Sequence, residues 1–318
     1  MEAEIERYIS YRKNLGYSSK NLMPALKHLD RYLVKQHAGW HQLLQPCFFL
    51  QMREHLPGET RSVNGIITTV RGFFNFLVRR ETIAENPLKD IPAYRQNAYI
   101  PFVFSIEQTQ LLLVAVQNAI RRQEQFFLHD QAVWLAIELM AGCGLRIAEP
   151  LHLLVKQYHP HEKTIYIEKT KFKKDRLLPL PDSLNSAVQN YLSLRNAFLP
   201  PADTACLLTG MNQKGLSTKN IYPVFHQAVK AIGLDQKKRI IANTTFAAPT
   251  PHSLRHSFAV NSLKGIMERG GSGQNALPIL SIYMGHCKYR YTALYLKVID
   301  AQQRSGLVDF NIAHQEEL

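Results

Sequence analysis

The sequence has few of the features that mark extracellular proteins, membrane-spanning proteins or proteins with a structural metal site. Its four cysteines, Cys47, Cys143, Cys206 and Cys287, lie far apart and form no CxxC pair, so no structural zinc site or disulfide framework is expected. The first residues, MEAEIERYISYRKNLG, are charged and lack the apolar segment of a signal peptide. No apolar run is long enough to cross a bilayer. These absences predict a cytoplasmic protein that has no metal site and does not enter a membrane.

Acidic residues are also scarce. The 318 residues include 38 Lys and Arg but 25 Asp and Glu, which gives a formal net charge of +13 and a pI of about 9.6. This balance favours a polyanionic partner, nucleic acid before an acidic membrane surface. The first 100 residues carry a net +5 and the remainder +8, so both parts of the chain can face the same polyanion. A merely basic surface remains the alternative on charge alone.

Two domains are expected, since 318 residues exceed what one hydrophobic core usually organises. Residues 1–85 have helical spacing over 3–14, 19–37 and 63–77, where the last stretch carries one apolar face. Another face of that helix presents Arg71, Asn75 and Arg79, which we take as candidate contacts to DNA phosphates, although a solvated face explains them equally well. Three prolines interrupt residues 86–103, which predicts an interdomain linker.

Residues 104–300 form the expected second domain, mainly α-helical with a small β-hairpin. A capping box at Ser105–Gln108 predicts a helix start. Strand-like runs at 164–167 and 176–180 enclose a lysine-rich stretch, which predicts a hairpin with a basic tip. Further helices are expected at 129–141, 183–197, 217–232 and from 251, with a flexible loop at 270–273 and helical spacing again over 277–284 and 291–298.

Several short motifs follow one another in this second domain. In chain order they are Gly144-Leu145-Arg146-Ile147-Ala148-Glu149, the hairpin Lys171, His252-x-x-Arg255, Gly285-His286 and Tyr295. Each motif alone is weak, but their order, local sequence and most of their spacings resemble the tyrosine recombinase (phage integrase) family. The resemblance covers roughly residues 100–300, and residues 1–85 resemble the family's helical core-binding domain more loosely. It implies a helical core-binding domain plus an α+β catalytic domain, clamped together around a DNA duplex.

The residue types suit phosphodiester cleavage without a metal or other cofactor. Arg146 and Arg255 supply planar donor forks for the phosphate and its developing charge. His252 and His286 can donate hydrogen bonds to the phosphate, and His252 can also accept the proton of the nucleophile. By resemblance, Lys171 is the general acid toward the leaving 5′ oxygen, and Tyr295 attacks phosphorus to give a 3′-phosphotyrosine. No ATP is needed, because the covalent link conserves the bond energy.

Each assignment has a rival. Lys169, Lys173 and Lys174 compete with Lys171; we take Lys173 and Lys174 as DNA-binding residues. Tyr283, Tyr289 and Tyr291 compete with Tyr295, but the family nucleophile follows the Gly-His histidine by nine residues, which selects Tyr295. Glu149 is expected to support the site through an active-site side chain, and His256 is taken as structural.

The chain departs from the family pattern between Arg255 and His286, which are 31 residues apart. The extra length around 268–274 is either a tolerated insertion or a change in subunit contacts or DNA reach. The tail 301–318 is predicted to pass to a neighbouring protomer, with its apolar residues Leu307, Val308, Phe310 and Ile312 docking there.

The predicted function is site-specific recombination through a Holliday junction, by a homotetramer on double-stranded DNA. It would serve integration or excision of a mobile element, or resolution of replicon multimers, with accessory DNA-bending or directionality proteins possible and with the enzyme located at the nucleoid. Two alternatives stay open. One is a type IB topoisomerase-like enzyme that relaxes DNA, and the other is a non-catalytic DNA-binding protein on the same scaffold.

Overall fold

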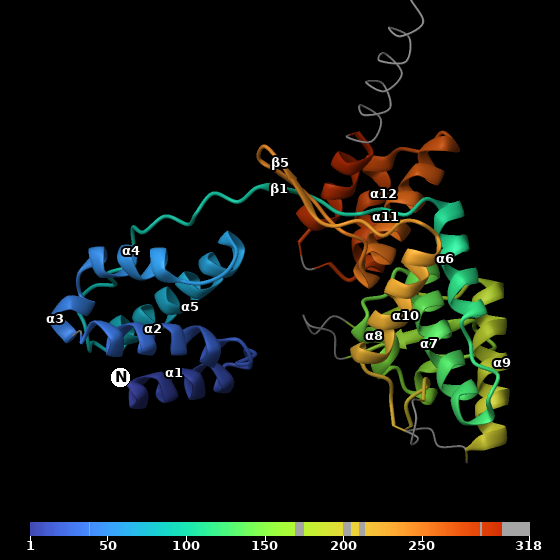
Figure 1. The fold of residues 1–318 in the computed structure, drawn as a ribbon, viewed down its shortest axis with the longest axis horizontal. Helices are drawn as coiled ribbons and strands as arrows, with labels where there is room; N and C mark the ends of the chain where they lie inside the picture. The colour runs from blue at the N-terminus through green and yellow to red at the C-terminus, as the bar shows by residue number, and fades with distance from the viewer. Residues whose placement is uncertain (38, 169–174, 200–204, 210–213, 287, 301–318) are drawn as a thin grey trace, which may run out of the picture. The chain divides into compact units, whose positions relative to one another are not determined.

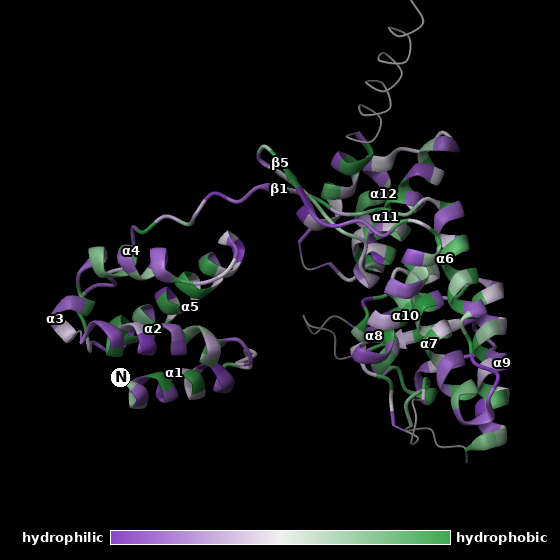
Figure 2. Cartoon of the chain, viewed as in Figure 1, coloured by the Kyte–Doolittle hydropathy of each residue, from purple (hydrophilic) through white to green (hydrophobic). Residues whose placement is uncertain are grey.

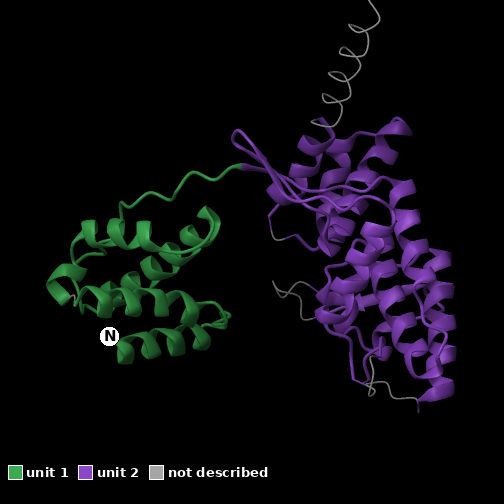
Figure 3. Cartoon of the chain, in the orientation of Figure 1, with its two compact units in different colours: residues 1–97 green, residues 98–318 purple. Residues whose placement is uncertain are grey.

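The computed structural model describes residues 1–37, 39–168, 175–199, 205–209, 214–286 and 288–300. The chain divides into two compact units, residues 1–97 and 98–318 (Figure 3), which are described one at a time. Lys171, Lys173 and Lys174 of the predicted hairpin tip lie outside the described residues, as does the predicted exchange segment in 301–318. Among the residues described, no helix is long and apolar enough to cross a membrane.

Unit 1 is built from helices around an aromatic core. The predicted apolar face of the fifth helix is confirmed, since Val63, Ile67, Val70 and Leu77 are buried and the helix packs on the second. Hydrophobic and hydrophilic bands alternate along the second helix (Figure 2), as expected for one with a single buried face. The helices are α1 (Glu2–Asn14), α2 (Leu22–Gln36), α3 (Trp40–Leu43), α4 (Pro46–His55) and α5 (Thr60–Arg79) (Figure 1).

The segment after α5 belongs to unit 1 for longer than the proline pattern indicates. Leu88 and Ile91 are buried in the unit 1 core. The Arg71 guanidinium donates to the carbonyls of both residues, and Asn86 Nδ2 donates to Asn75 Oδ1 at 2.7 Å. At its other end, the expected linker 86–103 enters a strand of unit 2 at residue 98. Within residues 86–103, the part that neither packs on unit 1 nor forms a strand of unit 2 is therefore shorter than the whole range.

Unit 2 is mainly helical. Its second helix is apolar on most sides and packs against five others, the first and the third to sixth of the unit, so it forms the centre of the core. The predicted capping box is confirmed, with Ser105 Oγ accepting from the Gln108 N–H at 3.1 Å. The helices are α6 (Ile106–Asn118), α7 (Glu124–Cys143), α8 (Ala148–His152), α9 (Asp182–Phe198), α10 (Thr218–Ala231), α11 (Pro251–Glu268) and α12 (Gly273–Tyr283). Residues 290–300 are also helical.

Two small sheets complete unit 2. In one, β2 (Tyr158–His159), β3 (Thr164–Ile167) and β4 (Arg176–Pro179) are antiparallel, which confirms the predicted hairpin strands. In the other, β6 (Thr244–Phe246) lies between a parallel β1 (Ala98–Ile100) and an antiparallel β5 (Arg239–Ile241). Side chains alternate between the faces of a strand, so the arginine that opens β4 points to the same buried face as Leu178.

The glycine-rich stretch after α11 is a short helix-to-helix turn. The Gly270 and Gly271 N–H groups donate to the carbonyls of Met267 and Ile266, and Gly270 has a φ of +80°, which favours glycine. The Ser272 hydroxyl then accepts from the Asn275 N–H and caps α12. The stretch predicted as a flexible loop thus orders the entry into α12, whose far end carries part of the site.

Candidate active site

Arg146 is placed by the turn that joins α7 to α8. Gly144 ends α7 with a φ of +59°, and a Cβ there would lie 2.5 Å from Phe258 Cδ1, so both the backbone and the available space require glycine. The Arg146 guanidinium donates to Glu149 Oε1 at 2.9 Å and to the Gly285 carbonyl at 2.8 Å. Its charge is thereby held in one position before any substrate arrives.

Arg255 lies on α11 and is 1 % exposed. Nη1 donates to the Gly144 carbonyl at 2.7 Å and Nη2 to the Met284 carbonyl. Burial, and then the nearby Arg146 charge, lower the pKa of Arg255 to about 9. An acceptor that carries a negative charge, such as a phosphate, would offset that cost.

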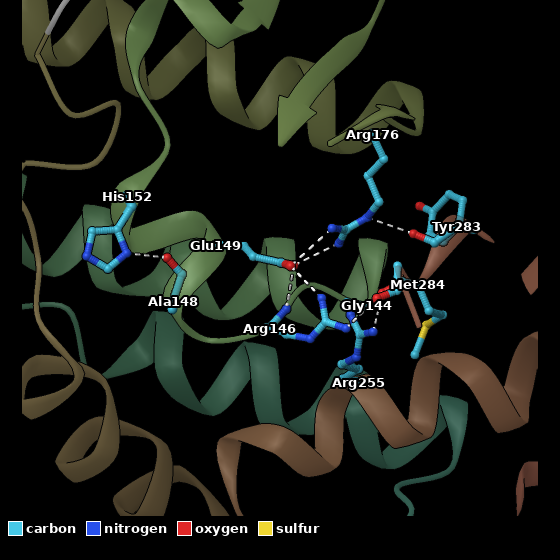
Figure 4. Close-up of polar contacts among 10 residues, drawn as sticks. Gly144, Arg146, Ala148, Glu149, His152, Arg176, Arg255, Tyr283 and Met284 are labelled. Atoms are coloured by element: carbon cyan, nitrogen blue, oxygen red, sulfur yellow. Dashed lines mark hydrogen bonds and ion pairs between the residues drawn. The ribbon is translucent and has the colours of Figure 1, made fainter. Parts of the chain in front are cut away.

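Arg176 is a site residue that the sequence motifs did not single out. It opens β4, and its guanidinium donates to Glu149 Oε2 at 2.8 Å and Glu149 Oε1 at 3.1 Å. Glu149 therefore bridges Arg176 and Arg146 (Figure 4). Burial alone would raise the pKa of Glu149, but the hydrogen bonds and charges of Arg176 and Arg146 bring it below its ordinary value.

Three consecutive backbone carbonyls at the end of α12 hold these three arginines. The carbonyl of Tyr283 accepts from Arg176 at 2.8 Å, and those of Met284 and Gly285 accept from Arg255 and Arg146. The C-terminal end of a helix presents unpaired carbonyls and a partial negative charge, which suits cations. Gly285 has a φ of +61°, and a Cβ there would lie 3.1 Å from an Arg176 nitrogen. The positive φ and the close arginine together explain why a glycine precedes His286.

Three histidines surround the arginines. His252 lines a cavity of about 650 Å³ together with Arg146 and Glu149. His286 Nδ1 lies 2.8 Å from the Thr292 hydroxyl. The third, His256, makes an edge-to-face contact with His252, with ring centroids 4.6 Å apart. The structure thus brings His252 and His286 together with Arg146 and Arg255, as the motifs predict, and adds a third ring.

Tyr295 is 2 % exposed and packs in an apolar cluster that includes Val260, Leu263 and Met284. Its hydroxyl lies 3.2 Å from Nδ1 of His256, and its ring centroid lies 6.2 Å from that of His286. The three alternative candidates for the nucleophile have other surroundings. Tyr289 and Tyr291 are about half exposed, and Tyr283 stacks on Phe258. Tyr295 is thus the one of the four tyrosines that contacts the histidine cluster through its hydroxyl.

The remaining candidates belong to unit 1 or lie outside the described residues. Arg71, Asn75 and Arg79 belong to unit 1. The first two hold the segment after α5 by the bonds already given, and Arg79 Nη1 lies 3.3 Å from the Tyr11 hydroxyl. Their contact with DNA stays a prediction, and so do the roles of Lys171, Lys173 and Lys174, which are outside the described residues.

Two half-buried histidines predict a loss of stability in mild acid. Burial, followed by neighbouring positive charges and rings, lowers the pKa of both His256 and His286 from 6.5 to about 3. Below the ordinary histidine pKa the unfolded chain binds these two protons and the folded chain does not. The free energy of unfolding should therefore fall as the pH drops from about 7 to about 5, by at most about 3 kcal/mol per pH unit. Burial, followed by the nearby Arg255 charge, lowers the pKa of His252 to about 4, but its side chain is exposed and solvent screens its charge, so it adds a smaller share.

Urea unfolding at a series of pH values measures this slope. His286→Asn keeps a polar atom near Thr292 but has no charge to gain, so it should roughly halve the slope. A wild-type stability that stays flat over this range, or a slope that the substitution leaves unchanged, would contradict the assignment.

Comparison with known proteins agrees with this geometry. A model described as "Phage integrase family" matches residues 105–301, more than half of the chain. The chain belongs to the phage integrase family. It is a tyrosine recombinase, an enzyme that breaks and rejoins DNA strands.

Relatives and solved structures extend the likeness of this tyrosine recombinase beyond its second unit. A putative integrase/recombinase, y4rE of Sinorhizobium fredii, is 27% identical over 294 residues, 92% of this chain and 90% of that protein. Tyrosine recombinase XerC of Alcanivorax borkumensis is 28% identical over 80% of this chain and 75% of its own length. The fold is similar to that of lambda integrase residues 75–356 in a dimer bound to a COC' core site, with a TM-score of 0.67, 17% identity, and coverage of 93% and 94% of the two chains.

Proposed function

We propose that this recombinase exchanges strands between two copies of one specific DNA site, with Tyr295 forming a 3′-phosphotyrosine at each crossover. The observation that carries the proposal is the convergence of Arg146, Arg255, His252 and His286 around a tyrosine that the spacing had already selected. The fold brings together residues up to 149 positions apart in the sequence.

The arrangement suits the chemistry of transesterification. Tyr295 Oη attacks phosphorus and gives its proton to a histidine of the site, the P–O5′ bond breaks, and the 5′ oxygen takes a proton from Lys171. Arg146 and Arg255 face the non-bridging oxygens, and because both are pre-positioned by backbone carbonyls, little reorganisation is needed as charge develops. Religation reverses each step, so a net exchange needs no external energy source.

Four protomers on two duplexes would carry out the exchange through a Holliday junction. A lambda integrase tetramer bound to a Holliday junction shares the fold, with a TM-score of 0.62 and 16% identity, which supports this assembly as a hypothesis. The predicted docking of Leu307, Val308, Phe310 and Ile312 on a neighbour belongs to the same hypothesis. Integration or excision of a mobile element and resolution of replicon multimers use the same site chemistry.

The decisive experiment uses the DNA that flanks the gene. Inverted repeats around a short spacer identify the candidate crossover site, and a nicked duplex of that sequence traps the covalent intermediate, because the short 5′-hydroxyl fragment diffuses away. We expect a protein–DNA adduct on a denaturing gel, with the DNA attached to the peptide that contains Tyr295. A plasmid with two such sites should recombine. Relaxation of any supercoiled plasmid without site dependence would indicate a topoisomerase, and absence of an adduct would indicate a DNA-binding protein.

A further inference from the structure

His256 is the residue that meets the hydroxyl of the nucleophile. It follows Arg255 directly on α11, and its Nδ1 lies 3.2 Å from Tyr295 Oη. The rings of His256 and Tyr295 meet edge to face at 5.7 Å. Tyr295 is 2 % exposed, and a phenol buried to this extent requires a hydrogen-bond partner within the protein. The contact therefore fixes where Oη points.

The protonation states define the direction of this hydrogen bond. Burial raises the pKa of Tyr295, with Arg255 and Arg146 acting in the opposite direction, so the phenol keeps its proton at neutral pH. Burial and then the His252, Arg255 and His286 side chains lower the pKa of His256 to about 3, so its ring is neutral. The phenol then donates to the lone pair of Nδ1, and the ring proton resides on Nε2.

We propose that His256 positions the nucleophile and accepts its proton during cleavage, an inference that rests on the proposed function. As Tyr295 Oη forms its bond to phosphorus, the Oη–H bond breaks and the proton moves to His256 Nδ1, giving an imidazolium. The P–O5′ bond breaks at the same centre, and the 5′ oxygen takes its proton from the general acid. In religation the imidazolium returns the proton to the departing Tyr295 oxygen.

The other two histidines are less suited to this role. His286 Nδ1 is engaged with the Thr292 hydroxyl. His252 lines the cavity with Arg146, where it can face the phosphate, and it contacts the His256 ring. From the sequence, His252 can accept this proton as a second role, whereas the geometry assigns proton acceptance to His256.

Substrate binding should strengthen His256 as a base. In the free protein, Arg255 and the two neighbouring histidines disfavour a charge on its ring. A bound phosphodiester brings a negative charge against Arg146 and Arg255, and a nearby negative charge raises the pKa of an imidazole. Proton acceptance therefore becomes favourable when the target phosphate is in place.

Two substitutions separate holding the hydroxyl from taking its proton. In His256→Asn, Oδ1 stands close to the position of Nδ1 and accepts the same hydrogen bond, but an amide does not take up a proton. His256→Ala removes both functions. His161→Asn, an exposed histidine in the turn between β2 and β3, is the matched control. Single-turnover adduct formation on the nicked duplex is followed between about pH 6 and about pH 9, together with DNA affinity.

We expect His256→Asn to bind DNA as wild type does and to cleave about 100-fold more slowly near neutral pH, the scale of general-base catalysis. Its rate should rise about tenfold per pH unit as hydroxide replaces the base, whereas the wild-type rate is flat. A substrate with sulfur in place of the 5′ oxygen, which leaves without a proton, should not rescue it, because the defect lies on the nucleophile side. His256→Ala should be at least as slow.

The other outcomes overturn the inference. These are a His256→Asn rate equal to wild type, a deficit of equal size at every pH, or rescue by the sulfur-containing substrate. If the wild-type protein itself forms no adduct, the proposed function fails, which is a different result from an active wild type beside an equally active variant.

Discussion

Tyr295→Phe is expected to abolish covalent attachment to DNA and all strand exchange. Phenylalanine fills the same apolar cluster but has no oxygen to attack phosphorus, so the cleavage rate should fall by about four orders of magnitude or more, as in other enzymes that lose a nucleophile. DNA affinity should be unchanged. The free energy of unfolding should fall by about 1 kcal/mol, because the hydrogen bond to His256 is lost.

Trapping on the nicked duplex measures the adduct, and a mobility shift measures binding. Tyr289→Phe and Tyr291→Phe are matched controls, since both hydroxyls belong to exposed side chains close by in the sequence. Both controls should form the adduct at nearly the wild-type rate. An undiminished adduct from Tyr295→Phe would refute the assignment of the nucleophile.

Arg255→Lys is expected to slow cleavage about 100- to 1000-fold, the range found when one preorganised donor to a developing oxyanion is lost. Lysine retains the positive charge, but a single ammonium group does not reproduce a planar fork that binds the Gly144 and Met284 carbonyls and has donors left for a phosphate. The substitution should also destabilise the fold by about 2 kcal/mol, because one buried carbonyl loses a charged partner.

The same trapping assay and a urea titration test this prediction. Arg269→Lys, at the exposed C-terminal end of the same helix, is the control and should change neither quantity. If Arg255→Lys cleaves at the wild-type rate, the guanidinium geometry is irrelevant to catalysis and the proposed phosphate contact is wrong.

Much of the site was predictable because its motifs are local. Gly144, two residues before Arg146, and Gly285, before His286, mark turns with positive φ, and the three-residue step from His252 to Arg255 is a helical step. The nearly alternating pattern of residues 164–167 and 176–179 gave the hairpin strands. Apolar spacing gave α5, and its buried face is the predicted one.

The parts that were missed depend on contacts between distant segments. Arg176 is 107 residues from the Tyr283 carbonyl to which it donates, and its one local sign is a charged residue on the buried face of a strand. The contact of His256 with Tyr295 spans 39 residues, so no local motif indicates it. Prolines end helices without showing whether the next residues return to the core, as Leu88 and Ile91 do.

The arginine anchors at the end of α12 have a consequence for variation in this family. The groups that bind Arg176, Arg255 and Arg146 are main-chain oxygens of residues 283–285, so an apolar exchange at Met284 leaves its anchor in place. A library of substitutions at Met284 should therefore show that apolar replacements retain cleavage activity. Insertion or deletion of one residue between Leu280 and Gly285 would instead shift the register of all three oxygens, and would displace three cations in a single mutational step.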